Sequence, residues 1–356
     1  MANTYRCPSC GAPLEYTPGT NGLVCTYCGT EVSIEQLSRN ETGENSEDRT
    51  ENHTASDIED THARQSFNGY TCESCGAQLI TDEYTTATTC CYCGSSALIQ
   101  ERLNGVLKPA GVIPFKINKE QAKQSFRRWL CKGMFTPSVF KQKATLEHIK
   151  GIYVPFWLYD YHAEISASAE CTKIYRQRRG NTEFVHTDYY IVERQGFSNY
   201  QKIPVDASEK MPDDMMDLME PYNYNELKEF EMPYLSGYES EKYNYESSDT
   251  QMTGRVEERV NNYILQDMRN SITGYSSTHI LRKQISLHRN RADYTLLPVW
   301  MITYRYKGEN KSFVINGQTG KQVGELPNSP IKIAAWFGGI TAGIMALLLL
   351  MGGFFG

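Results

Sequence analysis

The 356-residue sequence predicts a multidomain protein with two small β-rich units, an α+β globular domain and one C-terminal transmembrane helix. Three observations lead to this prediction. Cysteine pairs recur in two copies, strand-like and helix-like patterns alternate over a long central stretch, and an apolar run follows at the C-terminal end. The composition, with a formal charge of −6, excludes a strongly basic nucleic-acid binder, a collagen-like repeat and a small secreted disulfide protein.

Eight of the eleven cysteines stand in C-x-x-C pairs, and each pair is followed by glycine. Within each copy 14 residues separate the two pairs, and the second copy repeats the first at an offset of 65 residues. Two such turns that face each other form a closed tetrahedral site of four thiolates, which is typical of a zinc ribbon. The sequence therefore predicts two structural Zn²⁺ sites, because no coordination position stays open for water. The expected ligands are Cys7, Cys10, Cys25, Cys28, Cys72, Cys75, Cys90 and Cys93.

Structural disulfides are the alternative interpretation of these cysteines. They require an oxidising compartment, and the first seven residues contain no apolar run of the kind that begins a cleavable signal peptide. Cys91 competes with Cys90 as a ligand, but only Cys90 keeps the two-residue spacing. We expect Cys91, Cys131 and Cys171 to be ordinary thiols rather than nucleophiles.

The chain divides into five predicted segments. The 36–66 stretch carries eight acidic residues and three arginines with almost nothing apolar. It cannot bury enough apolar surface to offset the conformational entropy lost on ordering, so we expect a disordered linker. The predicted segments are zinc ribbon 1 at 1–35, the acidic linker at 36–66, zinc ribbon 2 at 67–102, the α+β domain at 103–326 and the transmembrane anchor at 331–356.

In the first half of the α+β domain, a strand interrupted by proline is expected over 108–117. Asn118 is a good N-cap with Gln121 in the reciprocal position, which predicts a helix that ends near Gly133. Aromatic and β-branched residues over 152–161, then alternation as far as Ile174, predict strands. The remaining elements of this half are further strands at 184–192 and 200–205 and short helices within 213–231.

The second half of the domain is predicted to contain the longest helix. It begins near Asp249, and its apolar face consists of Val256, Val260, Tyr263, Ile264 and Met268. Strands are expected at 279–288 and 296–306, and turn residues at 307–311 and 316–320 predict a terminal hairpin region.

Charge is distributed unevenly along the chain. Residues 101–150 carry a net charge of +8, and residues 206–250 carry −10. The simpler interpretation is that the two segments neutralise each other within one fold. The alternative is a basic face in 101–150 that contacts anionic lipid headgroups.

The segment 333–355 contains 23 residues without a charge. As a helix it would be roughly 34 Å long, which is enough to cross a hydrocarbon core of about 30 Å. Lys321 and Lys332 precede it and no charged residue follows, so the positive-inside tendency places the N-terminal bulk in the cytoplasm. We expect a tail-anchored, single-pass protein of the cell membrane. Ala335, Gly339 and Gly343 recur every four residues and are candidates for packing against a partner helix, and thus for an oligomer.

No catalytic motif is found in the sequence, so we expect a protein that is not an enzyme. The Gly317–Lys321 stretch has only part of a P-loop pattern and coincides with an Asn-Gly turn. The histidines are scattered along the chain and indicate no metal site of their own.

Several stretches taken together resemble one family, the YdjG-like bacterial membrane proteins, which are often labelled as TFIIB-type zinc-ribbon proteins. They are the first two cysteine pairs, Y-V-P-F-W-L-Y at 153–159, P-Y-L-S-G at 233–237, L-P-V-W at 297–300 and V-I-N-G-Q-T-G-K at 314–321. The resemblance covers nearly the whole chain. It implies a non-enzymatic membrane component that, with a partner membrane protein and an SPFH (flotillin-like) protein, recruits phage-shock protein A during envelope stress. The zinc ligands implied are the eight cysteines named above, and no catalytic residue is implied.

Two other functions stay open. A membrane-tethered nucleic-acid binder would need a basic ribbon face, yet Arg6 is the only cation in 1–35, and 67–100 contains neither Lys nor Arg. The third hypothesis is an unrecognised enzyme in 103–326. We therefore expect an adaptor for protein partners at the membrane.

Overall fold

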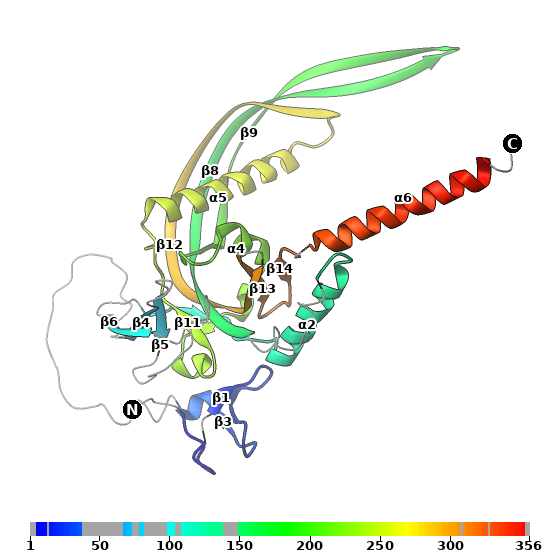
Figure 1. Ribbon diagram of the computed structural model, residues 1–356. Helices are drawn as coiled ribbons and strands as arrows, with labels where there is room; N and C mark the ends of the chain where they lie inside the picture. Colours follow the sequence, from blue (N-terminus) through cyan, green and yellow to red (C-terminus); the bar gives the residue numbers. More distant parts are fainter. Residues whose placement is uncertain are drawn as a thin grey trace, which may run out of the picture.

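A long, strongly curved β-sheet organises the chain, and one helix projects away from it (Figure 1). The computed structural model describes residues 5–12, 14–37, 67–72, 78–81, 98–103, 108–137, 149–306, 309–326 and 328–352. In these ranges the N-terminal strands are β1 (Leu14–Tyr16), β2 (Gly22–Cys25), β3 (Glu31–Ser33), β4 (Phe67–Cys72), β5 (Gln78–Thr81) and β6 (Leu98–Leu103). The strands that follow are β7 (Gly111–Val112), β8 (Lys150–Arg179), β9 (Thr182–Asp206), β10 (Lys228–Glu229), β11 (Glu239–Glu241), β12 (Ser277–Tyr306), β13 (Glu309–Asn316) and β14 (Gln322–Gly324). The helices are α2 (Lys119–Lys132), α4 (Asp213–Met219), α5 (Thr250–Ser271) and α6 (Pro330–Gly352), with 3-10 turns η2 (Tyr224–Glu226) and η3 (Met232–Leu235).

Strands β1, β2 and β3 form a small antiparallel sheet of their own. The large sheet follows the order β10-β7-β12-β8-β11-β5-β4-β6, with β9 paired to β8 and β13 paired to β12 and β14. Strand β8 lies between β9 and β12 and is antiparallel to both. Register shifts at Ile280/Arg282, Arg289/Arg291 and Tyr159/Tyr161 mark irregularities of the kind that bend and twist a strand. The sheet accordingly curves around α5 (Figure 1).

The two faces of the sheet bury different clusters, because successive side chains of a strand point to opposite faces. In β8, Tyr153, Trp157 and Tyr159 belong to a cluster that also holds residues of α2, α5 and the N-terminal unit. Val154 and Phe156 belong to a second cluster, in which they lie with residues of α4. Aromatic and β-branched residues on both faces therefore make this part of β8 a central buried strand.

Helix α2 confirms the expected capping box. Asn118 Oδ1 accepts a hydrogen bond of 2.8 Å from the Gln121 backbone N–H, and Gln121 Oε1 accepts one of 2.9 Å from that of Asn118. The predicted long helix is α5, whose buried residues are Met252, Val256, Val260, Ile264 and Met268. Tyr263 was wrongly assigned to the apolar face, since it is 41% exposed and its ring stacks on Tyr200 at a centroid distance of 6.0 Å.

The other strand predictions need correction in their lengths. The strand expected over 108–117 is only the two-residue β7, in a stretch that contains Pro109 and Pro114. The segments expected as separate strands join into the single strands β8, β9 and β12. The outer parts of β9 and β12 are largely exposed on both faces, so their sequence lacks the apolar alternation that would show a continuous strand, whereas β8 keeps alternating buried residues over 161–171.

The oppositely charged segments meet in at least two places. Lys116 Nζ lies 2.6 Å from Glu226 Oε2, and Lys150 Nζ lies 2.7 Å from Glu239 Oε1. These ion pairs support the interpretation that 101–150 and 206–250 neutralise each other in part.

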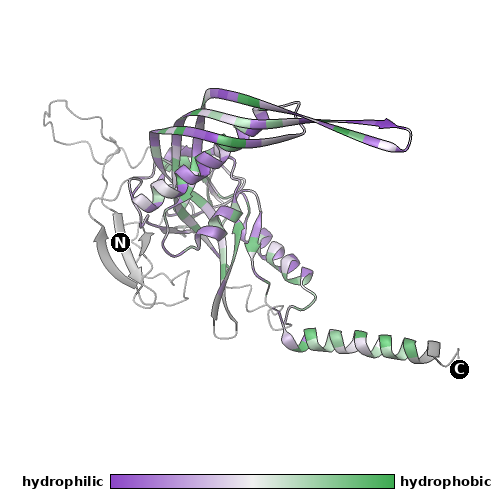
Figure 2. Ribbon diagram, turned by 90° about the horizontal axis from the view of Figure 1, so that it is seen from above, coloured by the Kyte–Doolittle hydropathy of each residue, from purple (hydrophilic) through white to green (hydrophobic). Residues whose placement is uncertain are grey.

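The C-terminal helix α6 is long and apolar enough to cross a membrane over Pro330–Leu348, and none of that segment is buried. Figure 2 shows it as a mostly hydrophobic rod beside the more polar body. Its first turn is tied to the loop after α2. The Ser329 N–H donates to the Phe135 carbonyl at 2.8 Å, Lys332 Nζ donates to the Thr136 carbonyl at 2.7 Å, and Trp336 packs edge-on against Phe135.

Candidate metal centre

Two tight turns with the same backbone geometry carry the first four cysteines. The Gly11 N–H donates to the Cys7 carbonyl at 2.9 Å, and the Gly29 N–H donates to the Cys25 carbonyl at the same distance. Both glycines have positive φ values, 74° and 77°, a conformation that other residues rarely adopt. A Cβ at either position would meet nothing within 4 Å, so the glycine is needed for its backbone conformation and not for space.

The two turns bring their four sulfur atoms together. The Sγ atoms of Cys7, Cys10, Cys25 and Cys28 all lie within 4.8 Å of one another. Three of the pairs, Cys7–Cys28, Cys10–Cys25 and Cys10–Cys28, are separated by 3.4, 3.5 and 3.4 Å. A tetrahedral zinc site with bonds of about 2.3 Å places its sulfur atoms about 3.8 Å apart. The geometry therefore fits a tetrahedral metal ion such as zinc.

The surroundings of these thiols affect their ionisation unequally. Burial opposes the charge of Cys7, but hydrogen bonds from the backbone N–H groups of Ser9 and Cys10 favour the thiolate and lower the pKa of Cys7 to about 6. The hydroxyl and N–H groups of Thr30 lower the pKa of Cys28. The Ala12 N–H favours the thiolate of Cys10, yet the neighbouring sulfurs raise its pKa to about 12. A metal ion binds cysteines as thiolates, and its positive charge would favour that state of the ligands.

Ser9 and Thr30 complete the polar surroundings of the cysteines. Thr30 Oγ1 lies 3.1 Å from Cys28 Sγ and 3.1 Å from Ser9 Oγ. Neither residue was predicted from the sequence. The repeat within the sequence could have indicated Thr30, because it lies two residues after Cys28 just as Ala12 lies two residues after Cys10. In the structure the carbonyls of Ala12 and Thr30 accept equivalent hydrogen bonds, from the N–H groups of Cys7 and Cys25.

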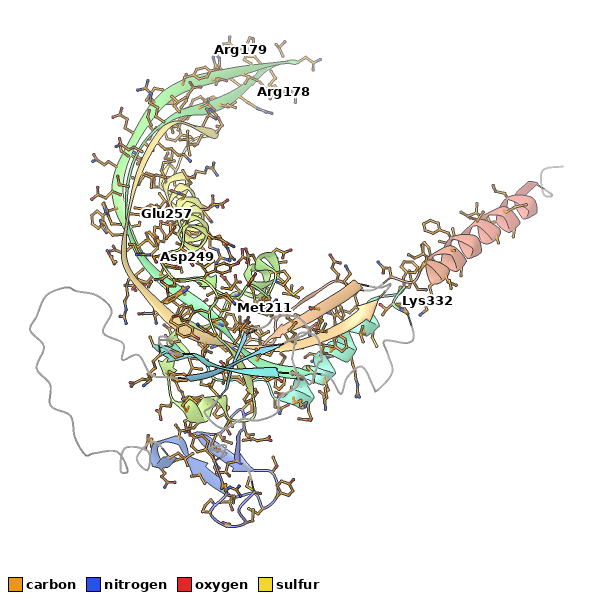
Figure 3. The ribbon with its side chains drawn as sticks, turned by 60° about the vertical axis from the view of Figure 1, so that its left-hand side comes forward. Arg178, Arg179, Met211, Asp249, Glu257 and Lys332 are labelled. Atoms are coloured by element: carbon orange, nitrogen blue, oxygen red, sulfur yellow. The ribbon has the colours of Figure 1, made fainter. Side chains whose placement is uncertain are left out.

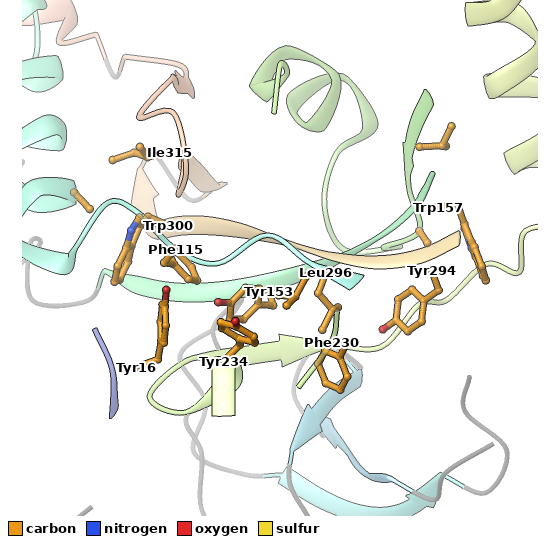
Figure 4. Close-up of a cluster of buried hydrophobic side chains, with 14 of the residues drawn as sticks. Tyr16, Phe115, Tyr153, Trp157, Phe230, Tyr234, Tyr294, Leu296, Trp300 and Ile315 are labelled. Carbon is orange, nitrogen blue, oxygen red and sulfur yellow. The ribbon is translucent and has the colours of Figure 1, made fainter. Parts of the chain in front are cut away.

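The site is attached to the main core. Cys7 and Cys25 are buried in the large hydrophobic cluster, whereas Cys10 and Cys28 are exposed. The connection runs through β1: the Tyr16 N–H donates to the Ser236 carbonyl at 3.0 Å, and the Tyr16 ring packs edge-on against Tyr234 at 5.5 Å. Figure 4 shows Tyr16 and Tyr234 in the same layer as Phe115, Tyr153 and Trp300.

Of the eight predicted ligands, the structure brings together these four. The backbone of Cys72 ends β4, while Cys75, Cys90 and Cys93 lie outside the described residues, as does Cys91. At the repeat offset of 65 residues, β1 corresponds to residues 79–81, which lie in β5. Strand β5 pairs with β11, with Ile80 opposite Ser240. Both cysteine-rich units therefore contact the short stretch 236–241, which follows η3. Cys131 is exposed and Cys171 is buried.

The stretches that suggested the family resemblance lie in the core. Tyr153, Phe156, Trp157 and Tyr159 are buried in β8, and Trp300 donates a hydrogen bond of 2.7 Å from Nε1 to the Ile117 carbonyl. Tyr153, Trp157, Tyr159 and Trp300 belong to the buried cluster that also contains Cys7 and Cys25. The three residues expected on a helix-packing face, Ala335, Gly339 and Gly343, are all exposed on α6.

The comparisons with known proteins give one full-length relative. No family model and no solved structure matches the chain. A protein of Bacillus subtilis (strain 168) with the name "Uncharacterized protein YdjG" is 40% identical over 359 aligned residues, which cover 100% of both chains. Because this identity extends over the full length of both proteins, the chain belongs to the YdjG family.

Proposed function

We propose that this protein is a tail-anchored adaptor whose body faces the cytoplasm and binds protein partners next to the membrane. The observation that carries the proposal is that the four-cysteine centre and the apolar helix are both fastened to one body. Cys7 and Cys25 pack in the core cluster that contains Trp300, and Lys332 at the start of α6 is bonded to the loop after α2. A partner bound by the body would therefore be held near the lipid surface.

The centre is suited to a structural role with zinc. Its four thiols fill a tetrahedral coordination shell, so a bound Zn²⁺ would have no open position for water or substrate. Cys7 and Cys25 face the core, so a bound metal would fix the position of β1 and β2. We propose that the unit is a zinc ribbon of the TFIIB type. We also propose that Cys72, Cys75, Cys90 and Cys93 form a second ribbon with a second zinc ion.

Orientation and partners follow from the charge pattern and the family. Lys321 and Lys332 precede the apolar helix, which favours a cytoplasmic body. Reduced thiols, which zinc requires, suit that compartment. The resemblance supplies the partner class: a complex with a partner membrane protein and a flotillin-like protein that recruits phage-shock protein A under envelope stress. On this proposal the role is non-enzymatic.

The proposal is tested by affinity purification of the tagged full chain from detergent-solubilised membranes of stressed cells. We expect a phage-shock protein A-type and a flotillin-like protein to co-purify with the wild type and with Cys131→Ser, whose exposed thiol lies outside the metal centre. Cys25→Ser should lose most of this binding. If neither partner co-purifies with the wild type, the proposed recruitment is wrong.

A further inference from the structure

The outer end of the β8–β9 hairpin reaches beyond the rest of the sheet. Strand β12 begins at Ser277, which lies opposite Thr172, so the residues after Thr172 have no third strand beside them in the described structure. Residues 173–179 pair only with 182–188. Figures 1 and 2 show this two-stranded ribbon as an arm that extends freely from the body. A two-stranded ribbon has little stability of its own in water, so contact with another surface would stabilise this arm.

The arm combines cations with exposed apolar side chains. Its tip carries Arg178 and Arg179 (Figure 3), and neither has an ion pair with any residue of the described structure. Glu183 stands opposite Arg178 in the ladder, but its ion pair, at 3.8 Å, is with Arg176. Both arginines are exposed. The exposed apolar residues of the arm and its base are Ile174, Tyr175, Phe184, Val185, Tyr189, Tyr190 and Ile191.

These side chains occupy both faces of the ribbon. Val185 is opposite Arg176 and Tyr189 is opposite Thr172, whereas Phe184 is opposite Gln177 on the other face. Tyr189 is 71% exposed and Val185 is 56% exposed. Aromatic rings with arginines are the combination that favours the headgroup region of a bilayer, where a ring can sit at the interface and a cation can meet lipid phosphate.

The arm and the apolar helix extend toward the same side of the body. In Figure 1 and in the perpendicular view of Figure 2, both the hairpin and α6 project in the same direction. Figure 3 shows the curved sheet as an arc whose open side faces the side from which α6 leaves. The start of α6 is tied to the body through Ser329 and Lys332, so this direction is set by bonded contacts. A membrane that receives α6 lies on the side toward which the arm reaches.

We propose that the tip of the β8–β9 hairpin is a second membrane contact, which binds anionic lipid headgroups through Arg178 and Arg179. Tyr175, Phe184 and neighbouring apolar side chains then lie in the interfacial layer. This inference rests on the proposed anchoring by α6. The anchor and the arm together would give the body two separate contacts with the bilayer and so fix its orientation over the membrane.

Hydrogen–deuterium exchange of the full chain in lipid vesicles tests this contact. The chain is reconstituted in vesicles of phosphatidylcholine alone and of phosphatidylcholine with phosphatidylglycerol, and exchange is followed in peptides from 173–191. We expect exchange at least about fivefold slower in the anionic vesicles, since one basic residue near an anionic surface contributes about that factor in binding. High salt should abolish the difference.

Two charge-reversal variants separate the tip from the rest of the sheet. Arg178→Glu/Arg179→Glu should lose the protection by anionic lipid. The control variant Arg282→Glu/Lys283→Glu makes the same change of charge at two exposed, adjacent positions of β12, away from the tip. It should keep the protection by anionic lipid. Arg178 and Arg179 are the last two residues of β8 and pair with Glu183 and Thr182 at the outer end of the ladder, so the substitutions leave the pairs nearer the body unchanged. The salt dependence of the wild type gives a second readout that needs no variant.

Three outcomes would overturn the inference. Equal exchange in neutral and anionic vesicles means that the tip does not bind anionic lipid. Equal loss of protection in both charge variants means a general charge effect. Protection that rises with protein concentration in detergent, without lipid, means that a second copy of the chain covers the arm. In each case the chain stays in the vesicles if α6 is the anchor, whereas a chain that fails to remain with either vesicle contradicts the anchoring itself.

Discussion

The Ser236 side chain donates a hydrogen bond of 2.7 Å to the carbonyl oxygen of Leu14, which lies 222 residues earlier in the chain. The Tyr16 N–H donates a second hydrogen bond to the Ser236 carbonyl, so each of the two segments both donates to and accepts from the other. Ser236→Ala should lower the free energy of unfolding by about 1 kcal/mol, because it removes one hydrogen bond from a partly buried carbonyl. It should also speed hydrogen exchange in 14–25. Ser286→Ala, at an exposed position of β12, is the matched control and should change neither quantity.

Removal of the metal ligands should weaken the whole body. For Cys25→Ser we expect the loss of one zinc equivalent per chain by elemental analysis. The melting temperature should fall by about 5 °C or more, because the buried contacts of β1 and β2 depend on the site. Cys131→Ser should keep the wild-type metal content and stability. A Cys25→Ser protein with unchanged metal content would mean that the four-cysteine cluster does not bind the ion.

Gly317 lies where two parts of the core come close together. A Cβ at this position would lie 2.6 Å from the Phe115 ring and 2.8 Å from Pro298 Cβ. Gly317→Ala should therefore destabilise the fold by about 1–3 kcal/mol through overpacking. Gly254→Ala is the control: this glycine is in α5 with open space around it, so the substitution should stabilise by up to about 1 kcal/mol. Denaturant unfolding measures both, and equal effects would refute the close approach at Gly317.

Asp206 predicts a pH dependence of stability. Burial raises the pKa of Asp206 to about 6, although the Arg255 guanidinium at 2.7 Å opposes the rise. The unfolded chain has a pKa of about 3.9 at this residue, so the folded state binds the proton more tightly. Protonation of Asp206 therefore contributes to the free energy of unfolding in full below about pH 3.9, and this contribution is lost as pH rises through about 6.

Between pH 5 and pH 7.5 the wild type should therefore lose about 1 kcal/mol of stability that Asp206→Asn does not lose. Thermal unfolding of the full chain in detergent across this range measures the difference. Asp188→Asn, at an exposed position of the hairpin, should keep the slope of the wild type. Identical slopes for the wild type and Asp206→Asn would contradict a raised pKa.

Local patterns in the sequence predicted the local features of the structure. The Asn118 and Gln121 capping box and the cluster of Cys7, Cys10, Cys25 and Cys28 depend on residues a few positions apart within each turn, so their spacing carries the information. The same holds for the apolar run that became α6.

Features that depend on distant contacts left no local signal. The junction of Leu14 with Ser236 joins segments that are far apart in the chain, and neither residue is unusual for its position. The continuous strand β9 was predicted as two pieces because most of its side chains are exposed on both faces. Tyr263 fits the helical spacing of the buried face but lies at its edge, where Tyr200 covers it only in part.

The central claim is that α6 holds a metal-binding body at the membrane, and cell fractionation of a truncated chain tests it most directly. The full chain and a chain without residues 331–356 are expressed, and their membranes are washed with high salt, which removes proteins held only by charge. The account predicts that the full chain stays in the membrane fraction, while the truncated chain is found in the soluble fraction with its zinc bound. A truncated chain that remains with the washed membranes as completely as the full chain would contradict it.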